Sequence, residues 1–267
     1  MNSIYDEIVK IRSEGESAAV ATVTSVKGSA PRGEGSKMLI KSDGRIIGSV
    51  GGGSAEAQVM QEAMKVMSDG KARMLRYDLT GKDAAKGGMI CGGNMEVFIE
   101  PIISDPVLYI FGGGHISFSI SKIGKMLGFR VVVIDDREEF ANPRRFPEAD
   151  ETIAQDIEMV IPELKINKSS YIVIVTRGHI LDERVLEWAI RTNAKYIGMI
   201  GSRKKNAIVF SHLESRGFPR ELLETVHAPI GLDINAETPE EIAVSILAEI
   251  IMVRREKCAQ TFKGCKG

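Results

Sequence analysis

The sequence has few cysteines and no long hydrophobic run. Its three cysteines, Cys91, Cys258 and Cys265, are too few, and odd in number, for a disulfide framework, which leaves buried or reactive thiols. No apolar stretch approaches the length of a transmembrane helix, and Asp6 and Glu7 stand where a secretory signal would have an apolar core. We therefore expect a cytoplasmic protein with no membrane segment.

The chain also lacks an excess of charge of either sign. Its formal net charge is −1 over 267 residues, so it offers no electrostatic reason to bind nucleic acid or a membrane surface. Internal repeats and low-complexity segments are absent as well. These absences leave a soluble globular protein that is long enough for two ordinary domains.

The most informative feature that is present is a glycine-rich turn after an apolar run. Residues 107–111 have the length of a buried strand, and Gly112, Gly113 and Gly114 permit a tight turn. Apolar residues then repeat at helical spacing over residues 116–127. This order predicts a strand, a turn and a helix of the kind that binds nucleotides.

An acidic pair follows the next apolar run, residues 130–134. Asp135 lies about twenty residues after Gly114, the separation at which an acid meets a ribose hydroxyl in dinucleotide-binding folds. Asp135 and Asp136 would repel a 2′-phosphate, which favours NAD over NADP, whereas the neighbouring Arg137 weakens that preference. A purely structural glycine turn is the alternative.

The chain divides in a segment where two prolines bracket a short polar connection, residues 100–106. We place the boundary between residues 102 and 103. Downstream, the apolar runs 171–176 and 196–200 are each followed by a helical pattern, and residues 238–241 carry a capping box before a last helix. Residues 103–267 are therefore predicted to form a Rossmann-like parallel sheet with a C-terminal helix.

Residues 1–102 show a different pattern. Short strand-like segments at 18–26, 37–40 and 95–100 surround one clear helix, 54–67. This pattern predicts a smaller α+β domain, and the whole chain is assigned to the α/β class.

Three loops of the first domain contain residues suited to binding a ligand. Gly51, Gly52, Gly53 and Ser54 run into a helix, so their amides are suited to bind a phosphate. Residues 28–32 supply Arg32, and residues 89–93 supply the thiol of Cys91. Each loop has a plainer interpretation, since a triple glycine is often only a turn and a cysteine beside glycines is often a small buried hydrophobe.

The second domain contributes further candidates near the carboxyl edge of its sheet. His115 follows the glycine turn, and Arg177 and His179 follow a buried strand. Either histidine could contact a ligand or only hydrogen-bond a loop. Ser202 precedes Arg203, whose charge opposes the helix dipole, a conflict that indicates either an anionic ligand or a solvated basic turn.

A set of motifs in a fixed order resembles the XdhC/CoxI family of xanthine dehydrogenase accessory proteins, over almost the full chain. The matching segments are residues 28–32, 48–53, 91–93 with 96–101, 112–115, 135–142, 176–179, 196–202 and 229–232. Eight such motifs together are far more specific than any one glycine pattern.

The resemblance implies a chaperone for the molybdenum cofactor (molybdopterin) that assists sulfuration and insertion of the cofactor into a xanthine dehydrogenase-type hydroxylase. It implies a molybdenum hydroxylase client, and a homodimer, with a cysteine desulfurase as a further candidate partner. Our hypothesis is that Cys91 contacts the molybdenum or carries the sulfur, while Arg32 and residues 51–54 hold the phosphate. We assign no metal ligands and no role to Cys258 and Cys265.

Two other functions stay open at this stage. The Rossmann-like domain could serve an NAD(P)-dependent oxidoreductase, or a regulator that senses NAD or another nucleotide without catalysing a reaction. The oxidoreductase interpretation lacks a serine, tyrosine and lysine set or a carboxylate pair at catalytic spacing, although spatial clusters cannot be read from one sequence.

Overall fold

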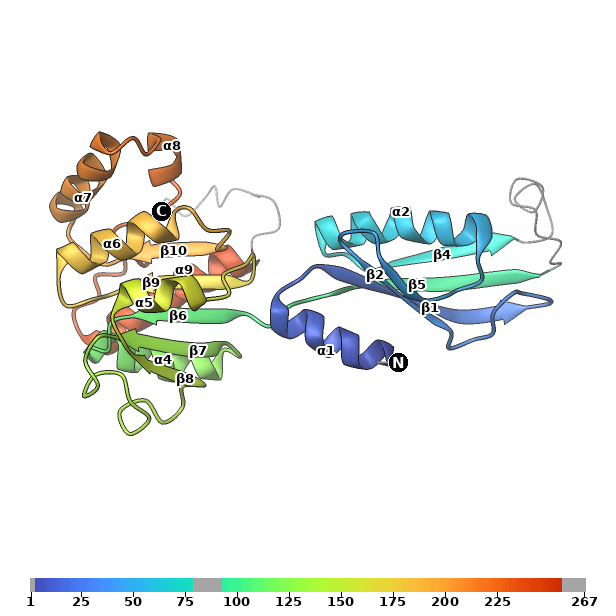
Figure 1. The fold of residues 1–267 in the computed structure, drawn as a ribbon, viewed down its shortest axis with the longest axis horizontal. Coiled ribbons are helices and arrows are strands. Elements are labelled where there is room, and N and C mark those ends of the chain that lie inside the picture. Colours follow the sequence, from blue (N-terminus) through green and yellow to red (C-terminus); the bar gives the residue numbers. More distant parts are fainter. Residues whose placement is uncertain (1–2, 79–92, 256–267) are drawn as a thin grey trace, which may run out of the picture. The chain divides into compact units, whose positions relative to one another are not determined.

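The computed structural model describes residues 3–78 and 93–255. The chain divides into two compact units, Met1–Asp105 and Pro106–Gly267 (Figure 1). The first unit is built on an antiparallel sheet and the second on a parallel sheet. The predicted α/β class, with a smaller α+β part followed by a Rossmann-like sheet, is confirmed.

The first unit contains a five-stranded sheet in the order β3-β2-β1-β5-β4, with antiparallel neighbours throughout (Figure 1). Its elements are α1 (Ile4–Glu14), β1 (Ala18–Lys27), β2 (Lys37–Lys41), β3 (Ile46–Gly48), α2 (Gly53–Asp69), β4 (Arg73–Asp78) and β5 (Asn94–Ile102). The helix predicted over residues 54–67 is α2.

Both faces of this sheet are covered, because β1 alternates its small apolar side chains between them. Ala19 and Ala21 belong to the core beneath α2, whereas Ala18 and Val20 pack with Ile11 of α1 on the other face. The sheet thus supports α2, whose first residues follow the glycine turn of residues 51–53.

The second unit contains a five-stranded parallel sheet in the order β10-β9-β6-β7-β8. The strands are β6 (Val107–Phe111), β7 (Arg130–Asp135), β8 (Glu151–Ala154), β9 (Ser170–Ile174) and β10 (Tyr196–Met199). The helices are α4 (His115–Met126), α5 (Ile157–Val160), the 3-10 turn η1 (Ile161–Glu163), α6 (His179–Ala189), α7 (Arg203–Ser215), α8 (Arg220–Leu223) and α9 (Pro239–Arg255).

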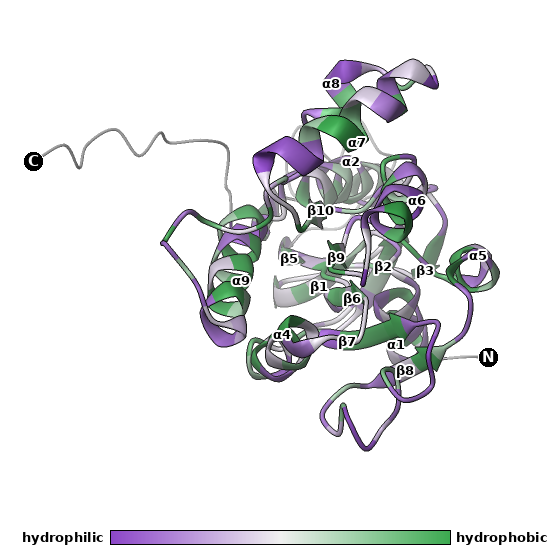
Figure 2. Cartoon of the chain, turned by 90° about the vertical axis from the view of Figure 1, so that its left-hand side faces the viewer, coloured by the Kyte–Doolittle hydropathy of each residue, from purple (hydrophilic) through white to green (hydrophobic). Residues whose placement is uncertain are grey.

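Helices cover both faces of the parallel sheet. Figure 2 shows α4 and α9 on one side of its strands and α5 and α6 on the other. In β6, Leu108 and Ile110 pack toward α4 and α9, while Tyr109 and Phe111 pack toward α6. Burial on both faces explains why these strands appear in the sequence as continuous apolar runs.

The capping box predicted before the last helix is present. The amide of Glu241 donates to Thr238 Oγ1 at 3.2 Å, and the amide of Thr238 donates to the Glu241 carboxylate at 3.1 Å. The elements that the sequence analysis did not predict are α1 and several short or edge elements, namely β3, β4, β8, α5, η1 and α8. No helix in the described part of the chain is long and apolar enough to cross a membrane.

Candidate functional site

The strand order creates a reversal point between β6 and β9. From β6 the chain proceeds to β7 and β8 on one side and then returns to β9 and β10 on the other. The helices that follow β6 and β9, α4 and α6, therefore cover opposite faces of the sheet. In open parallel sheets the crevice at this point, outside the carboxyl ends of the strands, is where ligands bind.

Two helices begin beside this crevice with glycine at the N-cap. Gly114 precedes His115 of α4, and Gly178 precedes His179 of α6. Neither N-cap supplies a side-chain hydrogen bond to its helix, and a Cβ atom at either glycine would meet nothing within 4 Å. Where no side chain caps a helix, the backbone amides of its first turn and the helix dipole together favour the binding of an anion.

At the other two glycines of the turn, the neighbouring backbone leaves no room for a side chain. A Cβ atom on Gly112 would lie 2.3 Å from the carbonyl oxygen of Val175, and one on Gly113 would lie 2.1 Å from that of Phe140. Gly112 also adopts a φ of 109°. Only Gly114 of the three leaves open space beside the crevice.

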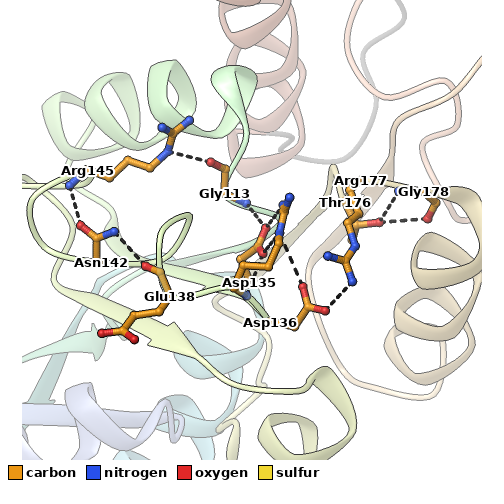
Figure 3. A network of polar contacts seen from close by, with 10 residues as sticks. Gly113, Asp135, Asp136, Glu138, Asn142, Arg145, Thr176, Arg177 and Gly178 are labelled. Carbon is orange, nitrogen blue, oxygen red and sulfur yellow. Dashed lines mark hydrogen bonds and ion pairs between the residues drawn. The ribbon is translucent and has the colours of Figure 1, made fainter.

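Asp135 lies at the end of β7, against the glycine turn, but its carboxylate is used inside the protein. It accepts hydrogen bonds from the Gly113 amide at 2.8 Å and from Arg137 Nε at 2.8 Å (Figure 3). Burial raises the pKa of Asp135, but the hydrogen bonds from Arg137 and Gly113 outweigh burial and lower it. The Asp135 side chain is only 4% exposed, so ribose recognition there would require Arg137 to move.

Asp136, the next residue, pairs across the crevice. Arg177 Nη2 lies 2.6 Å from Asp136 Oδ2, and Figure 3 shows the two side chains pointing toward each other. Asp136 follows β7 and Arg177 follows β9, the two neighbours of β6. Arg177 remains 49% exposed, so its guanidinium is accessible to a ligand beside the start of α6.

The loop after β7 holds the glycine turn in place. Arg145 Nε donates to the carbonyl oxygen of Gly113 at 2.9 Å, and Asn142 supports the loop through Glu138 and Arg145 (Figure 3). The guanidinium of Arg137 lies 3.6 Å from the ring centroid of Phe140. These contacts pack the loop after β7 firmly against the glycine turn.

Asp182 is a residue of this site that the sequence analysis did not identify. It accepts hydrogen bonds from the backbone amide of Thr176 at 3.1 Å and from its hydroxyl at 2.7 Å. Burial is the main cause that raises the pKa of Asp182 to about 6, although the Thr176 hydrogen bonds oppose it. The sequence signal that could have identified Asp182 is an acidic residue in the first turn of a helix that follows a predicted strand.

Ser202 and Arg203 lie at the same edge, one strand farther out, after β10. Ser202 caps α7 by accepting the Lys205 amide at 3.3 Å. Arg203 is 87% exposed and lines a cleft of about 430 Å³ with Ile230, Asp233 and other residues of the loop before α9. The structure therefore gathers residues 112–115, 135, 136, 177 and 179 at the carboxyl edge of the sheet around its reversal point, with Ser202 and Arg203 beside them.

In the first unit, Gly51 and Gly93 both approach residues 28–32. A Cβ atom on Gly51 would lie 2.7 Å from Pro31, and one on Gly93 would lie 2.6 Å from the carbonyl oxygen of Ser29. Residues 28–32 thus lie against both of these glycines. Arg32 is exposed here, and Cys91 lies outside the described residues.

The glycine turn before α2 already holds an anion, the carboxylate of Glu56. Glu56 Oε1 accepts hydrogen bonds from the Ser49 hydroxyl at 2.6 Å and from the amides of Val50 and Gly51 at 3.2 and 3.3 Å. Burial raises the pKa of Glu56, but these hydrogen bonds outweigh it and lower the pKa. A phosphate at the same amides would have to displace Glu56. Among the described residues, no group of three or more His, Cys, Asp or Glu could hold a metal ion.

Comparison with known proteins gives consistent matches. Residues 108–250 match the family model described as the XdhC Rossmann domain, and residues 11–78 match that of the XdhC and CoxI family. An Escherichia coli protein, the uncharacterized YqeB, is 32% identical over 94% of this chain, which spans only 46% of YqeB.

Three further proteins are similar over most of their own length. A probable xanthine dehydrogenase subunit of Bacillus subtilis is 25% identical over 96% of this chain and 98% of its own. The molybdenum cofactor insertion chaperone PaoD of Escherichia coli is 25% identical over 90% and 84%. A crystal structure of a Bacillus halodurans xanthine dehydrogenase shares the fold, with a TM-score of 0.52, 22% identity and coverage of 98% and 99%.

The Rossmann-domain match alone covers more than half of the chain, and its limits enclose the crevice described above. The chain therefore belongs to the XdhC and CoxI family.

Proposed function

We propose that this protein is an accessory factor that binds molybdenum cofactor and assists its sulfuration and insertion into a xanthine dehydrogenase-type hydroxylase. The observation that carries the proposal is the similarity to a molybdenum cofactor insertion chaperone along 90% of this chain and 84% of the relative. Both units of the chain fall within such a match. In this role the cofactor is cargo, which the protein binds and then transfers to the hydroxylase.

The crevice of the second unit fits a phosphate group of the kind that a nucleotide carries. It has two glycine-capped helix starts at Gly114 and Gly178 and the exposed guanidinium of Arg177. Backbone amides and a guanidinium are the usual ligands of phosphate oxygens.

We assign the cofactor itself to the first unit, with its metal end at Cys91 and its phosphate at Arg32 and residues 51–54. Arg32 is exposed beside the glycine turn, and Cys91 precedes Gly93, which packs against Ser29. A thiolate near that position would be a soft ligand or a sulfur carrier. A phosphate bound at residues 51–54 requires Glu56 to leave the amides of Val50 and Gly51.

The partners follow from this role. A molybdenum hydroxylase is the client, and a cysteine desulfurase is the candidate source of sulfur. The similarity to a probable component of xanthine dehydrogenase supports a client of that class.

The experiment is to purify the protein from a host that makes molybdenum cofactor and to measure molybdenum and released pterin. The protein is then co-produced with a molybdenum hydroxylase. We expect bound pterin and molybdenum, and a more active hydroxylase than without it. A protein free of pterin that leaves the hydroxylase unchanged would rule the proposal out.

The role of Cys91 is tested by Cys91→Ser, with Cys258→Ser as the matched control. The Cys91 variant is expected to stay folded by circular dichroism but to lose pterin retention or hydroxylase activation, whereas the control keeps both. Full activation by Cys91→Ser would show that Cys91 has no such role.

A second candidate is nucleotide binding by the second unit, in a regulator or an NAD(P)-dependent oxidoreductase. It is favoured by the strand order, which matches five of the six strands of the dinucleotide-binding sheet. Calorimetry with NAD, NADP and mononucleotides tests binding, and hydride transfer to a substrate would be needed for the oxidoreductase. If none of the nucleotides binds, this candidate is lost.

A further inference from the structure

Asp182 and Asp135 are two buried acids at the carboxyl edge of the parallel sheet, and they differ in their partners. They are 7% and 5% exposed. Asp135 pairs with Arg137, whereas the described part of the chain gives Asp182 no ion pair. Burial acts to raise the pKa of both acids; hydrogen bonds from Arg137 and Gly113 outweigh it at Asp135, whereas the pKa of Asp182 rises to about 6. Asp182 is therefore the acid of this edge that can change its charge near neutral pH.

The charged groups around Asp182 are either distant or already engaged. His179 in the same turn of α6 and Lys205 of α7 favour its charged form, but neither forms an ion pair with it. Arg177, in the loop after β9, is bound by the acid that follows β7. Glu183, the next residue of α6, is engaged by a histidine and an arginine of α7. A proton is therefore the cation that neutralises Asp182 most directly.

The hydroxyl of Thr176 links Asp182 to the start of α6. It has one hydrogen but lies near two acceptors, Asp182 Oδ1 at 2.7 Å and the carbonyl oxygen of Gly178 at 3.0 Å, the second of which Figure 3 shows. When Asp182 is ionised, the hydroxyl donates to its carboxylate. When Asp182 is protonated, the acid donates to the hydroxyl oxygen and the hydroxyl donates to Gly178. Protonation thus reverses these hydrogen bonds without moving any atom heavier than hydrogen.

The same acid lies within one helical turn of the expected anion position. Gly178 is the N-cap of α6, and the backbone amide of Asp182 donates to the Gly178 carbonyl at 3.1 Å. An ionised Asp182 therefore places a negative charge close to an anion bound at the helix start. Because Asp182 is buried, solvent screens the repulsion between the two charges only weakly. The repulsion disappears when Asp182 is neutral.

We propose that the crevice takes up its phosphate group together with one proton, which passes from solvent to the carboxylate of Asp182; this rests on the anion binding proposed for the crevice. The bound anion favours protonation of Asp182, and by reciprocity protonation strengthens the binding of the anion. The affinity of the crevice for a phosphate group therefore falls as the pH rises through the neutral range.

Calorimetry of the full chain with sulfate and with NAD tests this coupling. The sulfate group and the pyrophosphate diester of NAD keep their charge between about pH 5.5 and 8, so any proton taken up goes to the protein. The affinity should fall about fivefold or more from the acid to the basic end of this range. Titrations at pH 6.5 in two buffers of different ionisation enthalpy count the protons, and we expect about half a proton per bound probe.

Asp182→Asn keeps the shape of the side chain without its charge. At pH 8 it should bind the probes about fivefold more tightly than wild type, and it should lose most of the proton uptake. Glu183→Gln is the matched control, since Glu183 is buried on the same helix but engaged by α7, and it should retain the uptake. His179→Gln should also retain most of the uptake, which distinguishes the acid from the neighbouring imidazole. Thermal unfolding verifies that each variant folds.

Thr176 provides a second pair of variants. Thr176→Val removes the hydroxyl that favours the ionised acid, so the pH at which the affinity falls should move upward, and Thr176→Ser should restore it. An unchanged pH profile in Thr176→Val would overturn the coupling through this hydroxyl.

The remaining outcomes separate the proton coupling from anion binding itself. Proton uptake that Asp182→Asn retains, or that His179→Gln abolishes, would overturn the proposal, because the proton would then reside elsewhere. Binding of a probe without proton uptake would overturn it as well, while leaving anion binding by the crevice intact. If neither probe binds at any pH, anion binding by the crevice is itself wrong, and the proton coupling is lost with it.

Discussion

The guanidinium of Arg177 and the carboxylate of Asp136 lie 2.6 Å apart and join the loops after β9 and β7, across the glycine turn that follows β6. The ion pair is partly exposed, so it contributes little to stability and can open at small cost. A phosphate would compete with Asp136 for the same arginine. This pair therefore controls how much positive charge the crevice presents.

Replacing Arg177 by alanine is expected to weaken binding of pyrophosphate or a nucleotide about tenfold, because one charge-assisted hydrogen bond is lost. Calorimetry measures the change. Arg184→Ala is the matched control, since Arg184 lies on α6 and pairs with Glu158. Asp136→Asn should act in the opposite direction and strengthen anion binding a few-fold. Equal affinities in all of these proteins would contradict the assignment.

Adjacent glycines of the turn should respond differently to alanine. Gly113→Ala places a methyl group against the Phe140 carbonyl and should destabilise the protein by roughly 1–3 kcal/mol. Gly114→Ala meets open space and should leave the unfolding midpoint nearly unchanged while reducing anion binding. Thermal unfolding and calorimetry separate the two effects. If Gly114→Ala unfolds the protein as readily as Gly113→Ala, our description of the turn is wrong.

Replacing Glu56 by alanine removes the carboxylate from the amides before α2. The start of that helix should lose about 1–3 kcal/mol of local stability at neutral pH, because its hydrogen bonds involve a charged group. Hydrogen exchange over residues 49–59 measures the loss, with the exposed Gln58→Ala as control.

The pH dependence of this effect has a definite sign. The pKa of Glu56 is lowered in the folded protein, so its contribution is present above the ordinary value of 4.5 and is lost as the pH falls through the lowered pKa. The difference between wild type and Glu56→Ala should therefore shrink in acid. A difference that does not depend on pH would show that the charge of Glu56 is not involved.

Asp182 should produce the opposite trend. Its folded pKa of about 6 lies above the ordinary 3.8, so the folded state binds the additional proton and stability from this group falls as the pH rises from about 4 to 6. Asp182→Asn should flatten that part of the stability profile, while Asp233→Asn, at an 85% exposed side chain, should not. Unfolding midpoints across pH 4–7 are the measurement, and parallel profiles for wild type and Asp182→Asn would refute the assignment.

Local sequence determined most of the architecture of the second unit. The apolar runs at residues 107–111 and 130–134 became buried parallel strands because both faces of each strand must be covered. The capping box at Thr238 and Glu241 closed as predicted, since its hydrogen bonds involve residues three apart. Short edge strands such as β8 were not predicted, because they have too few residues to show a repeating pattern of apolar side chains.

The roles of the acidic side chains were decided only by tertiary structure. Spacing placed Asp135 beside the glycine turn, but whether its carboxylate faces a ligand depends on Arg137 and on the Gly113 amide that it reaches. The turn of residues 49–54 has the sequence of an anion site, and the folded chain supplies Glu56 as its anion. Sequence periodicity reports which side chains are apolar and how they repeat along the chain. The charge that a carboxylate carries, and what that carboxylate can bind, depends on which donors lie within about 3 Å of it and on its exclusion from water, and both arise only when distant segments pack.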